Sequence, residues 1–297
     1  MSFGVHMYML ARSHFAGIVR ARSAAAKNLI RAILSLETEF TEYALAERWL
    51  YYLNAQNVVF PFGWYQPPPK GVSVLIGEPS RYARLKYRSL RDPDNFPSEK
   101  YKFSREAVIY PYFSAIDRST MMIGDHVATY YSGNNGNIRE WIKLAYHTTK
   151  SIIKEVKCNM TFSDLYGCAN VKIKELGACN NTFSIVGGLA SDIGHSIPFF
   201  GRERSNVCTA RNGELAIAIA NAISPERKFI NADNEKYIGN EAAFTIEPQI
   251  VIDGMPMASF HMIVVIIDNE VYVVEEFNEL FDLFGMSDWI YSGRRLG

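Results

Sequence analysis

The chain has 297 residues, of which 48% are hydrophobic, 13% aromatic and 21% charged. This composition excludes a disordered chain, a collagen-like chain and a small scaffold held together by disulfides. Lysine and arginine together number 31, as do aspartate and glutamate, so the formal net charge is zero. Zero net charge gives no global attraction to nucleic acid or to an anionic membrane, and we expect neither as a partner.

The cysteine spacing and the apolar segments bear on where the protein works. None of the four cysteines has the Cys-x-x-Cys spacing of a structural zinc site. The first residues lack the basic and then apolar segments of a secretory signal peptide. The longest apolar stretch, around Met255–Ile267, is far shorter than a membrane span. These features predict a cytoplasmic protein with reduced thiols.

The first half of the chain predicts two helices followed by strands. Apolar residues recur at helical spacing from about Ala16 to Leu36, with basic residues such as Arg22 on the other faces. Thr41 is placed to cap a second helix from Glu42 to about Ala55. Strands are expected over residues 72–76, 108–113 and 121–131, and an irregular, Pro-interrupted stretch over 81–102.

The second half repeats this order. A helix is predicted from Ile138 to about Val156, and Thr161-Phe-Ser-Asp resembles a capping box that starts another helix. A short helix is expected at Glu214–Ile223. Strands are predicted over residues 183–186, 242–252, 257–267 and 271–276.

The repeated order indicates an α+β fold of two similar halves, over about residues 16–136 and 137–277. Antiparallel strands from both halves would form one curved sheet with helices on its outer face. No linker separates the halves. We therefore expect a single domain over residues 1–297, without a separate N-terminal domain.

Three motifs carry the residues suited to catalysis or metal binding. They are Ile123-Gly124-Asp125-His126, Ile193-Gly194-His195-Ser196 and Phe244-Thr245-Ile246-Glu247-Pro248. In order and spacing they resemble the methionine aminopeptidase/prolidase/creatinase superfamily, which has the pita-bread fold. In that superfamily the Asp, His and Glu of these motifs converge on one metal centre. The resemblance covers about residues 16–276 and implies the same fold here.

The resemblance also implies an altered metal site. Metallo members use two Asp, one His and two Glu, and the first Asp lies eleven positions before the second. Ser114 stands at that position here, and His261 stands where the last Glu is expected. Asp117 would replace the missing Asp if the strand alignment slipped by three, although a turn role is the expectation for it. The expected metal ligands are Asp125, His195, Glu247 and His261.

Two imidazoles and two carboxylates suit one divalent ion of iron, manganese, cobalt or zinc. With one carboxylate fewer than in the superfamily, we expect a mononuclear site. His195 and Glu247 are the expected catalytic residues. Substrate contacts are expected from Ser114 and from the charged loop of Arg202, Glu203 and Arg204, although solvent exposure explains that loop equally well.

The other histidines are not expected to be ligands. Strand alternation points His126 away from the face of Asp125. His147 lies off the apolar stripe of its helix, and His6 and His14 are expected at the surface.

Four functions fit these residues. The preferred one is an enzyme that hydrolyses a C–N bond in a small amino-acid-like or peptide-like substrate, at one metal ion, as M24-type peptidases do. The second is a metal-free, creatinase-like hydrolase in which His195 is the acid/base. The third is a non-haem iron redox enzyme of a biosynthetic pathway. The fourth is a non-catalytic, peptide-binding relative. The resemblance is also compatible with a homodimer.

Overall fold

The computed structural model describes residues 3–182, 191–202 and 212–291, and its elements are those of an α+β protein. The helices are α1 (Phe3–Leu34), α2 (Glu42–Ala55), α3 (Gly136–Ile153), α4 (Phe162–Glu175), α5 (Asn212–Ile223), α6 (Asn278–Leu283) and α7 (Asp288–Tyr291). The strands are β1 (Val72–Gly77), β2 (Val108–Phe113), β3 (His126–Val127), β4 (Tyr130–Tyr131), β5 (Cys179–Asn180), β6 (Asp192–His195), β7 (Phe229–Asn231), β8 (Glu241–Ile246), β9 (Ile250–Val251), β10 (Met262–Ile267) and β11 (Glu270–Val274). Within these ranges, no helix has the length and apolar character needed to cross a membrane.

Helix caps hold the elements where the sequence predicts them. The side chain of Thr41 accepts a hydrogen bond from the N–H of Ala44 at the start of α2. At the start of α4, Thr161 and Asp164 form the predicted capping box. Helix α1 begins at Phe3, well before the predicted start, because no proline interrupts the chain from there to residue 16. The strand expected over residues 183–186 lies outside the described residues.

Two sheets are joined into one curved, antiparallel surface, as predicted. The first has the order β1-β2-β3, with β4 also paired to β2, and the second has the order β11-β10-β8. An isolated bridge between Ala128 and Phe260 connects the two sheets. A second bridge, between Ser196 and Phe244, connects the pair β6-β7 to β8. Strands from both halves of the chain therefore meet along the centre of the molecule.

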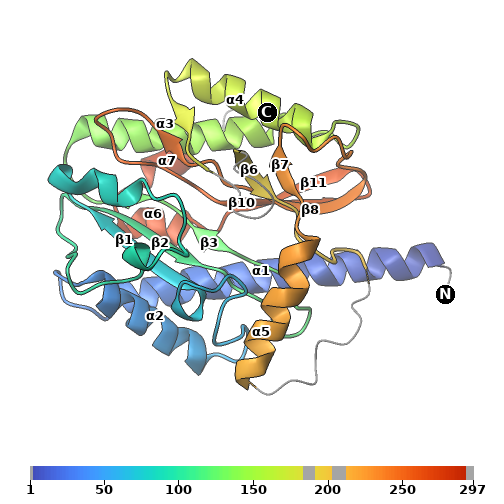
Figure 1. The fold of residues 1–297 in the computed structure, drawn as a ribbon, viewed down its shortest axis with the longest axis horizontal. Coiled ribbons are helices and arrows are strands. Elements are labelled where there is room, and N and C mark those ends of the chain that lie inside the picture. The colour runs from blue at the N-terminus through green and yellow to red at the C-terminus, as the bar shows by residue number, and fades with distance from the viewer. Residues whose placement is uncertain (1–2, 183–190, 203–211, 292–297) are drawn as a thin grey trace.

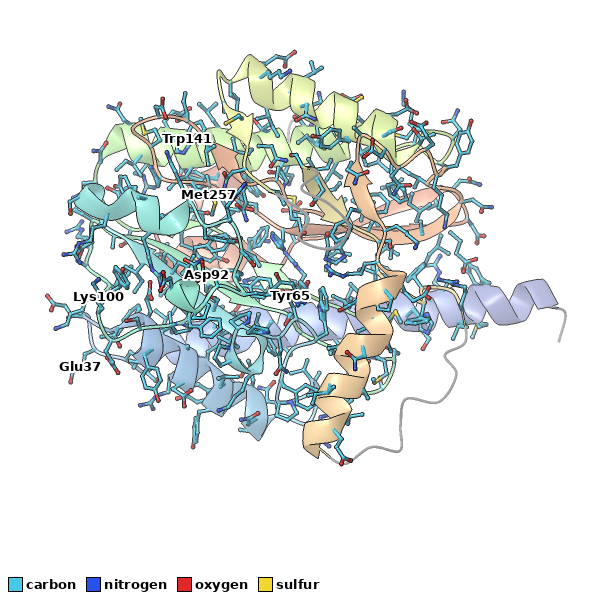
Figure 2. The ribbon with its side chains drawn as sticks, in the orientation of Figure 1. Glu37, Tyr65, Asp92, Lys100, Trp141 and Met257 are labelled. Atoms are coloured by element: carbon cyan, nitrogen blue, oxygen red, sulfur yellow. The ribbon has the colours of Figure 1, made fainter. Side chains whose placement is uncertain are left out.

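Two helix pairs enclose the strands. Figure 1 shows α1 beside α2 on one side of the strands and α3 beside α4 on the other. Strands β1, β2 and β10 are buried along their whole length, as expected for strands that are covered on both faces. In Figure 2, Tyr65 lies within the body of the molecule, whereas Glu37 and Lys100 lie at its edge.

Helix α1 packs directly on the segment that carries Asp125. A Cβ added at Gly124 would come within 2.6 Å of the Cβ of Ala21 and 2.7 Å of the backbone nitrogen of Arg22. Only glycine allows this approach. The strand predicted over residues 121–131 is present as the two short strands β3 and β4, and between them Ala128 and Thr129 bond to Phe260 and Ser259 instead.

Candidate functional site

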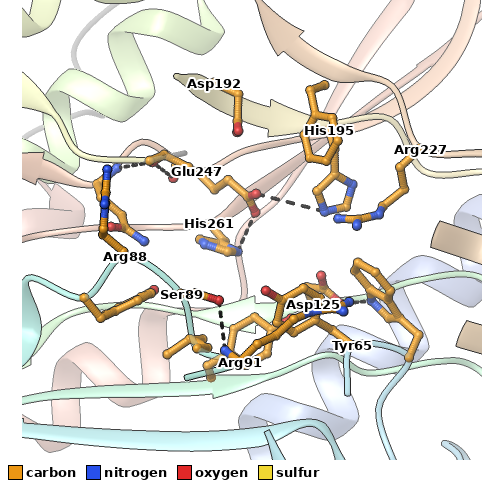
Figure 3. A pocket seen from close by; sticks show the side chains of 17 residues that line it. Tyr65, Arg88, Ser89, Arg91, Asp125, Asp192, His195, Arg227, Glu247 and His261 are labelled. Carbon is orange, nitrogen blue, oxygen red and sulfur yellow. Dashed lines mark hydrogen bonds and ion pairs between the residues drawn. The ribbon is translucent and has the colours of Figure 1, made fainter. Parts of the chain in front are cut away.

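One pocket brings together side chains from all three motifs (Figure 3). Its charged and imidazole-bearing lining residues are Arg88, Arg91, Asp125, Asp192, His195, Arg227, Glu247 and His261. Aromatic side chains, including Trp64, Tyr65 and Tyr112, complete much of the wall. All four predicted ligands therefore line the same pocket, although they are up to 136 positions apart in the sequence.

The Gly-His and Thr-Ile-Glu-Pro motifs are held against each other by their backbones. Gly194 has a φ of 149°, and a Cβ there would come within 2.1 Å of the Thr245 carbonyl oxygen. The N–H of His195 donates to Oγ1 of Thr245 over 3.0 Å, and the N–H of Glu247 donates to the Ile193 carbonyl over 2.7 Å. These contacts place the side chains of His195 and Glu247 next to each other.

Glu247 lies between two imidazoles. Its Oε2 is 2.8 Å from Nδ1 of His261, and its Oε1 is 4.0 Å from Nε2 of His195. The Nδ1 of His195 lies 3.0 Å from the carbonyl oxygen of Ser196, which can only accept a hydrogen bond. We therefore assign the neutral ring's proton to Nδ1, which leaves a lone pair on the Nε2 that faces Glu247.

The same neighbours set the ionisation of this group. Burial by itself would raise the pKa of Glu247, but the charges of His261, His195 and Arg227 lower it to about 2. Burial lowers the pKa of His195 to about 4, against the opposing attraction of Glu247. At neutral pH the pocket therefore contains an ionised Glu247 beside an uncharged His195.

Both the side chain and the backbone carbonyl of Asp125 accept hydrogen bonds. The indole Nε1 of Trp64 donates to its Oδ1 over 2.7 Å. The guanidinium of Arg22, which is fully buried, donates to the backbone carbonyls of Asp125, His261 and Glu275. Arg22 therefore connects helix α1 to two of the segments that carry site residues. The sequence places Arg22 off the apolar face of its helix, but strands and α6 cover this face of α1 too.

Asp192 and Arg227 are two of the pocket residues that were not among the predicted site residues. Asp192 is 3% exposed, and its Oδ1 accepts the N–H of Gly194 over 3.1 Å. Burial, with the charge of Glu247, raises the pKa of Asp192 to about 8. Strand alternation would put Asp192 and His195 on opposite faces, but an irregularity in β6 between them lets both line the pocket. Arg227, just before β7, lies in a charged run typical of a solvated loop, yet it is 8% exposed.

Other predicted residues lie away from this pocket. The hydroxyl of Ser114 accepts from the N–H of Tyr65 and donates to the carbonyl of Gly71, so it fixes a backbone turn and does not line the pocket. Arg202 lines a different cavity, and Glu203 and Arg204 lie outside the described residues. Asp117 binds the guanidinium of Arg20 and the side chains of its own turn, as its expected turn role requires.

The other described histidines are also placed. His126 is buried and lies outside the pocket lining, with its Nε2 3.3 Å from the hydroxyl of Tyr130. The prediction of a surface position for His14 is wrong, because α1 extends under the loop that carries Gly201. There, Nδ1 of His14 accepts the N–H of Gly201 over 3.1 Å, and His14 is only 6% exposed.

The side chains of the four predicted ligands do not converge on one point in the described part of the chain. Across residues 3–182, 191–202 and 212–291, no three His, Cys, Asp or Glu side chains are grouped closely enough to hold an ion. Glu247 and His261 bring donor atoms within 2.8 Å of each other, whereas His195 Nε2 is 4.0 Å from Glu247 and an oxygen of Asp125 is bound to Trp64. The ligand roles of the four residues stay predictions.

Known structures share this architecture, although no family profile and no curated protein matches the sequence. The X-Pro aminopeptidase from Thermotoga maritima aligns with a TM-score of 0.61 and 16% identity, covering 89% of this chain and 61% of that one. The prolidase from Pyrococcus furiosus aligns with a TM-score of 0.60 and 18% identity, covering 88% and 63%. The methionine aminopeptidase from Thermotoga maritima gives a TM-score of 0.60 and 13% identity, covering 88% and 96%.

These likenesses show the fold. The chain has the pita-bread fold that its motifs predicted, and that prediction is confirmed. It spans about 60% of the length of the X-Pro aminopeptidase and dipeptidase neighbours and nearly the full length of the methionine aminopeptidase.

Proposed function

We propose that this protein is an enzyme that hydrolyses a C–N bond in a small amino-acid-like or peptide-like substrate. His195 would act as its acid/base and Glu247 as the carboxylate partner of His195, without a metal ion. The observation that carries this proposal is the facing of His195 Nε2 and Glu247 Oε1 across 4.0 Å in a buried pocket. One water molecule can bridge such a gap by hydrogen bonding to both atoms.

The reaction follows from the protonation states of this pair. The bridging water attacks the carbon of the scissile C–N bond, a C–O bond forms, and the water's proton moves to Nε2 of His195. The C–N bond then breaks, and the same proton passes from Nε2 to the leaving nitrogen. The products are an amine and a carboxylic acid, or an amine and urea when the substrate is a guanidino acid. Glu247 remains ionised throughout and stabilises the transient imidazolium.

Several neighbours keep the pair in position. The carbonyl of Ser196 holds the ring of His195 so that Nε2 points at Glu247. Its contact with His261 fixes the other oxygen of the Glu247 carboxylate. Burial excludes bulk water and strengthens the attraction between the carboxylate and the imidazolium.

Hydrolysis at a metal ion is the second candidate, and one observation favours it. Oε2 of Glu247 and Nδ1 of His261 are buried 2.8 Å apart, and neither has another hydrogen-bond partner in the described part of the chain. A pair of facing donor atoms of this kind is typical of two ligands of one ion. The names of the structural neighbours, which are peptidases, are compatible with either form of the reaction.

The test is amine release from dipeptides, N-acylamino acids and guanidino acids, followed by mass spectrometry. We expect one class to be hydrolysed, with full activity after treatment with a chelator. His195→Gln and Glu247→Gln should each lower kcat by ~10²–10⁴-fold. His147→Gln, on α3 outside the pocket, is the matched control and should keep full activity.

Three outcomes would contradict the proposal. Activity that chelation abolishes and a divalent ion restores would establish the metal-dependent candidate instead. Unchanged activity in His195→Gln would exclude the proposed acid/base. Release of no amine from any of the three classes would reject C–N hydrolysis.

A further inference from the structure

Asp192 is a buried carboxyl group that the proposed reaction does not use. It lines the pocket from β6, three positions before His195, and it is only 3% exposed. Figure 3 shows its carboxyl group pointing into the pocket, on the side of Glu247. When water attacks an amide, negative charge develops on the carbonyl oxygen, and a hydrogen-bond donor in the pocket stabilises it.

Three hydrogen bonds hold Asp192 in this position. Its N–H donates to the carbonyl oxygen of Thr182 over 3.3 Å, and its own backbone carbonyl accepts from the side chain of Asn180. Oδ1 of the side chain accepts the N–H of Gly194 over 3.1 Å. The other oxygen, Oδ2, has no hydrogen-bond partner in the described part of the chain. The pocket therefore receives one fixed and unused polar atom from Asp192.

Asp192 and Glu247 share one pocket but differ in ionisation. Two carboxylates in a buried pocket repel each other, so that one of the two retains its proton. Glu247 holds the charge because it lies between the imidazoles of His261 and His195. Asp192 has no such partner, and its burial together with the charge of Glu247, which acts through space, raises the pKa of Asp192 to about 8. At neutral pH its proton lies on Oδ2, because Oδ1 already accepts an N–H.

This arrangement distinguishes between kinds of substrate. A protonated carboxyl group donates a hydrogen bond and is suited to an atom that accepts one, such as a carbonyl oxygen. It is poorly suited to the guanidinium of a guanidino acid, whose nitrogens only donate. Arg88, Arg91 and Arg227 line the same pocket and repel a cation. The pocket therefore suits an amide carbonyl better than a guanidinium.

We infer that Oδ2 of Asp192 donates a hydrogen bond to the carbonyl oxygen of a scissile amide. This bond strengthens as water attacks the amide, because negative charge then develops on that oxygen, and no proton is transferred from Asp192. The inference rests on the proposed function for the reaction. It adds a residue to that reaction and selects amides, such as N-acylamino acids, over guanidino acids.

Calorimetric titration at pH 7 tests the inference with N-acetylglycine and guanidinoacetate. The two probes share a glycine carboxylate and differ in the group that would meet Asp192, which is an acetyl carbonyl in one and a guanidinium in the other. We expect wild type to bind N-acetylglycine at least about ten-fold more tightly than guanidinoacetate.

Two variants of Asp192 separate a donor from an anion. The amide of Asp192→Asn keeps an acceptor for Gly194 and a donor for the pocket, so N-acetylglycine should bind within about three-fold of wild type. Asp192→Leu has a similar branched shape without polar atoms, and it should bind N-acetylglycine at least about ten-fold more weakly. Asp233→Leu, at an exposed aspartate outside the pocket, is the matched control and should bind as wild type does.

Infrared difference spectroscopy reports on the proton itself. The C=O stretching band of a protonated carboxyl group should be present in wild type at pH 7 and absent from Asp192→Asn. N-acetylglycine should shift this band, because Oδ2 then donates to the ligand. The shift is recorded on wild type, so it decides the question even if Asp192→Leu does not fold.

Four results would overturn the inference. The first is a wild type without the protonated band, and the second is a wild type that binds N-acetylglycine no better than guanidinoacetate. The third is folded Asp192→Leu that binds N-acetylglycine as tightly as wild type does. The fourth is an equal loss of binding in Asp192→Asn and Asp192→Leu, since that would show that Asp192 acts as an anion.

A further variant separates this inference from the proposed function. His195→Gln removes the proposed acid/base but retains Asp192, so it should keep the preference for N-acetylglycine. Hydrolysis can therefore fail while binding of the carbonyl succeeds. If an amide is hydrolysed, Asp192→Leu should lower kcat by ~10²–10³-fold and Asp192→Asn by less than about ten-fold. Hydrolysis of guanidino acids with a kcat unchanged in Asp192→Leu would reject this inference alone.

Discussion

The backbone of Gly194 lies against that of Thr245 so closely that a Cβ on Gly194 would come within 2.1 Å of the Thr245 carbonyl oxygen. This contact joins the two motifs that carry His195 and Glu247, and it explains why one contains a glycine and the other a small hydroxyl residue. The hydroxyl of Thr245 accepts the N–H of His195 over 3.0 Å. The spacing of His195 and Glu247 therefore depends on Gly194, which has no side chain.

Gly194→Ala should be strongly destabilising. The new methyl group would meet the backbone, and a φ of 149° is unfavourable for any residue with a Cβ. We expect the free energy of unfolding to fall by at least about 2 kcal/mol, as measured by urea denaturation. Gly167→Ala, in α4 and with no atom within 4 Å of the new Cβ, should be neutral or slightly stabilising. Equal effects of the two substitutions would contradict the argument.

Arg22→Met tests the connection between α1 and the site strands. The substitution leaves three backbone carbonyls, two of them in buried hydrogen bonds, without their donor, so the free energy of unfolding should fall by at least about 3 kcal/mol. Arg20→Met on the same helix is the control. Its ion pair with Asp117 is half exposed on the arginine side, and its loss should cost about 1 kcal/mol or less. A result in which Arg20→Met is the more harmful change would refute this role for Arg22.

Asp192→Asn should change how stability depends on pH. The pKa of Asp192 is about 8 in the folded protein and near 3.8 in the unfolded chain. Between these values the folded state binds a proton that the unfolded state has released, so this group lowers stability as the pH rises. The variant should therefore gain at least about 2 kcal/mol relative to wild type between pH 5 and pH 8. Urea denaturation at both pH values measures the gain, and a pH-independent difference would show that Asp192 is ionised.

The pH profile of hydrolysis reports on His195. Its lone pair is available only while the ring is neutral, and its pKa is about 4. We expect kcat/KM to stay level from pH 7 down to about 5 and to fall as the pH drops through 4. A fall centred near the ordinary histidine value of about 6.5 would mean that the base is solvated or is a different group.

The sequence predicted the fold and four of the residues that line the pocket. The helices with clear apolar stripes and caps, such as α2 and α4, have the bounds or caps that the pattern predicts. Asp125, His195, Glu247 and His261 line one pocket because the strands that carry them are paired by backbone hydrogen bonds. Periodicity and motif spacing depend on residues that are close in the sequence. They therefore predict the structure correctly where interactions between such residues decide it.

The sequence failed where a tertiary contact overrides the local rule. Asp192 lines the pocket because an irregularity in β6 breaks strand alternation. No residue type in that strand predicts this irregularity. Arg22 lies on a helix face that is polar in sequence, but strands and α6 cover that face and bury it. Arg227 follows a proline and a glutamate in a charged run, and only the aromatic platform of Trp64, far away in the sequence, makes it part of the site.

The buried guanidinium of Arg22 also constrains the order in which parts of the chain can fold. Its three acceptors lie 103, 239 and 253 positions later in the sequence. On a ribosome, Arg22 emerges early and remains hydrated until β10 and the segment after β11 have been made, because its charge cannot be buried before then. The long separations give this cluster a high contact order, which slows folding. The pocket is therefore expected to be among the last parts of the nascent protein to form.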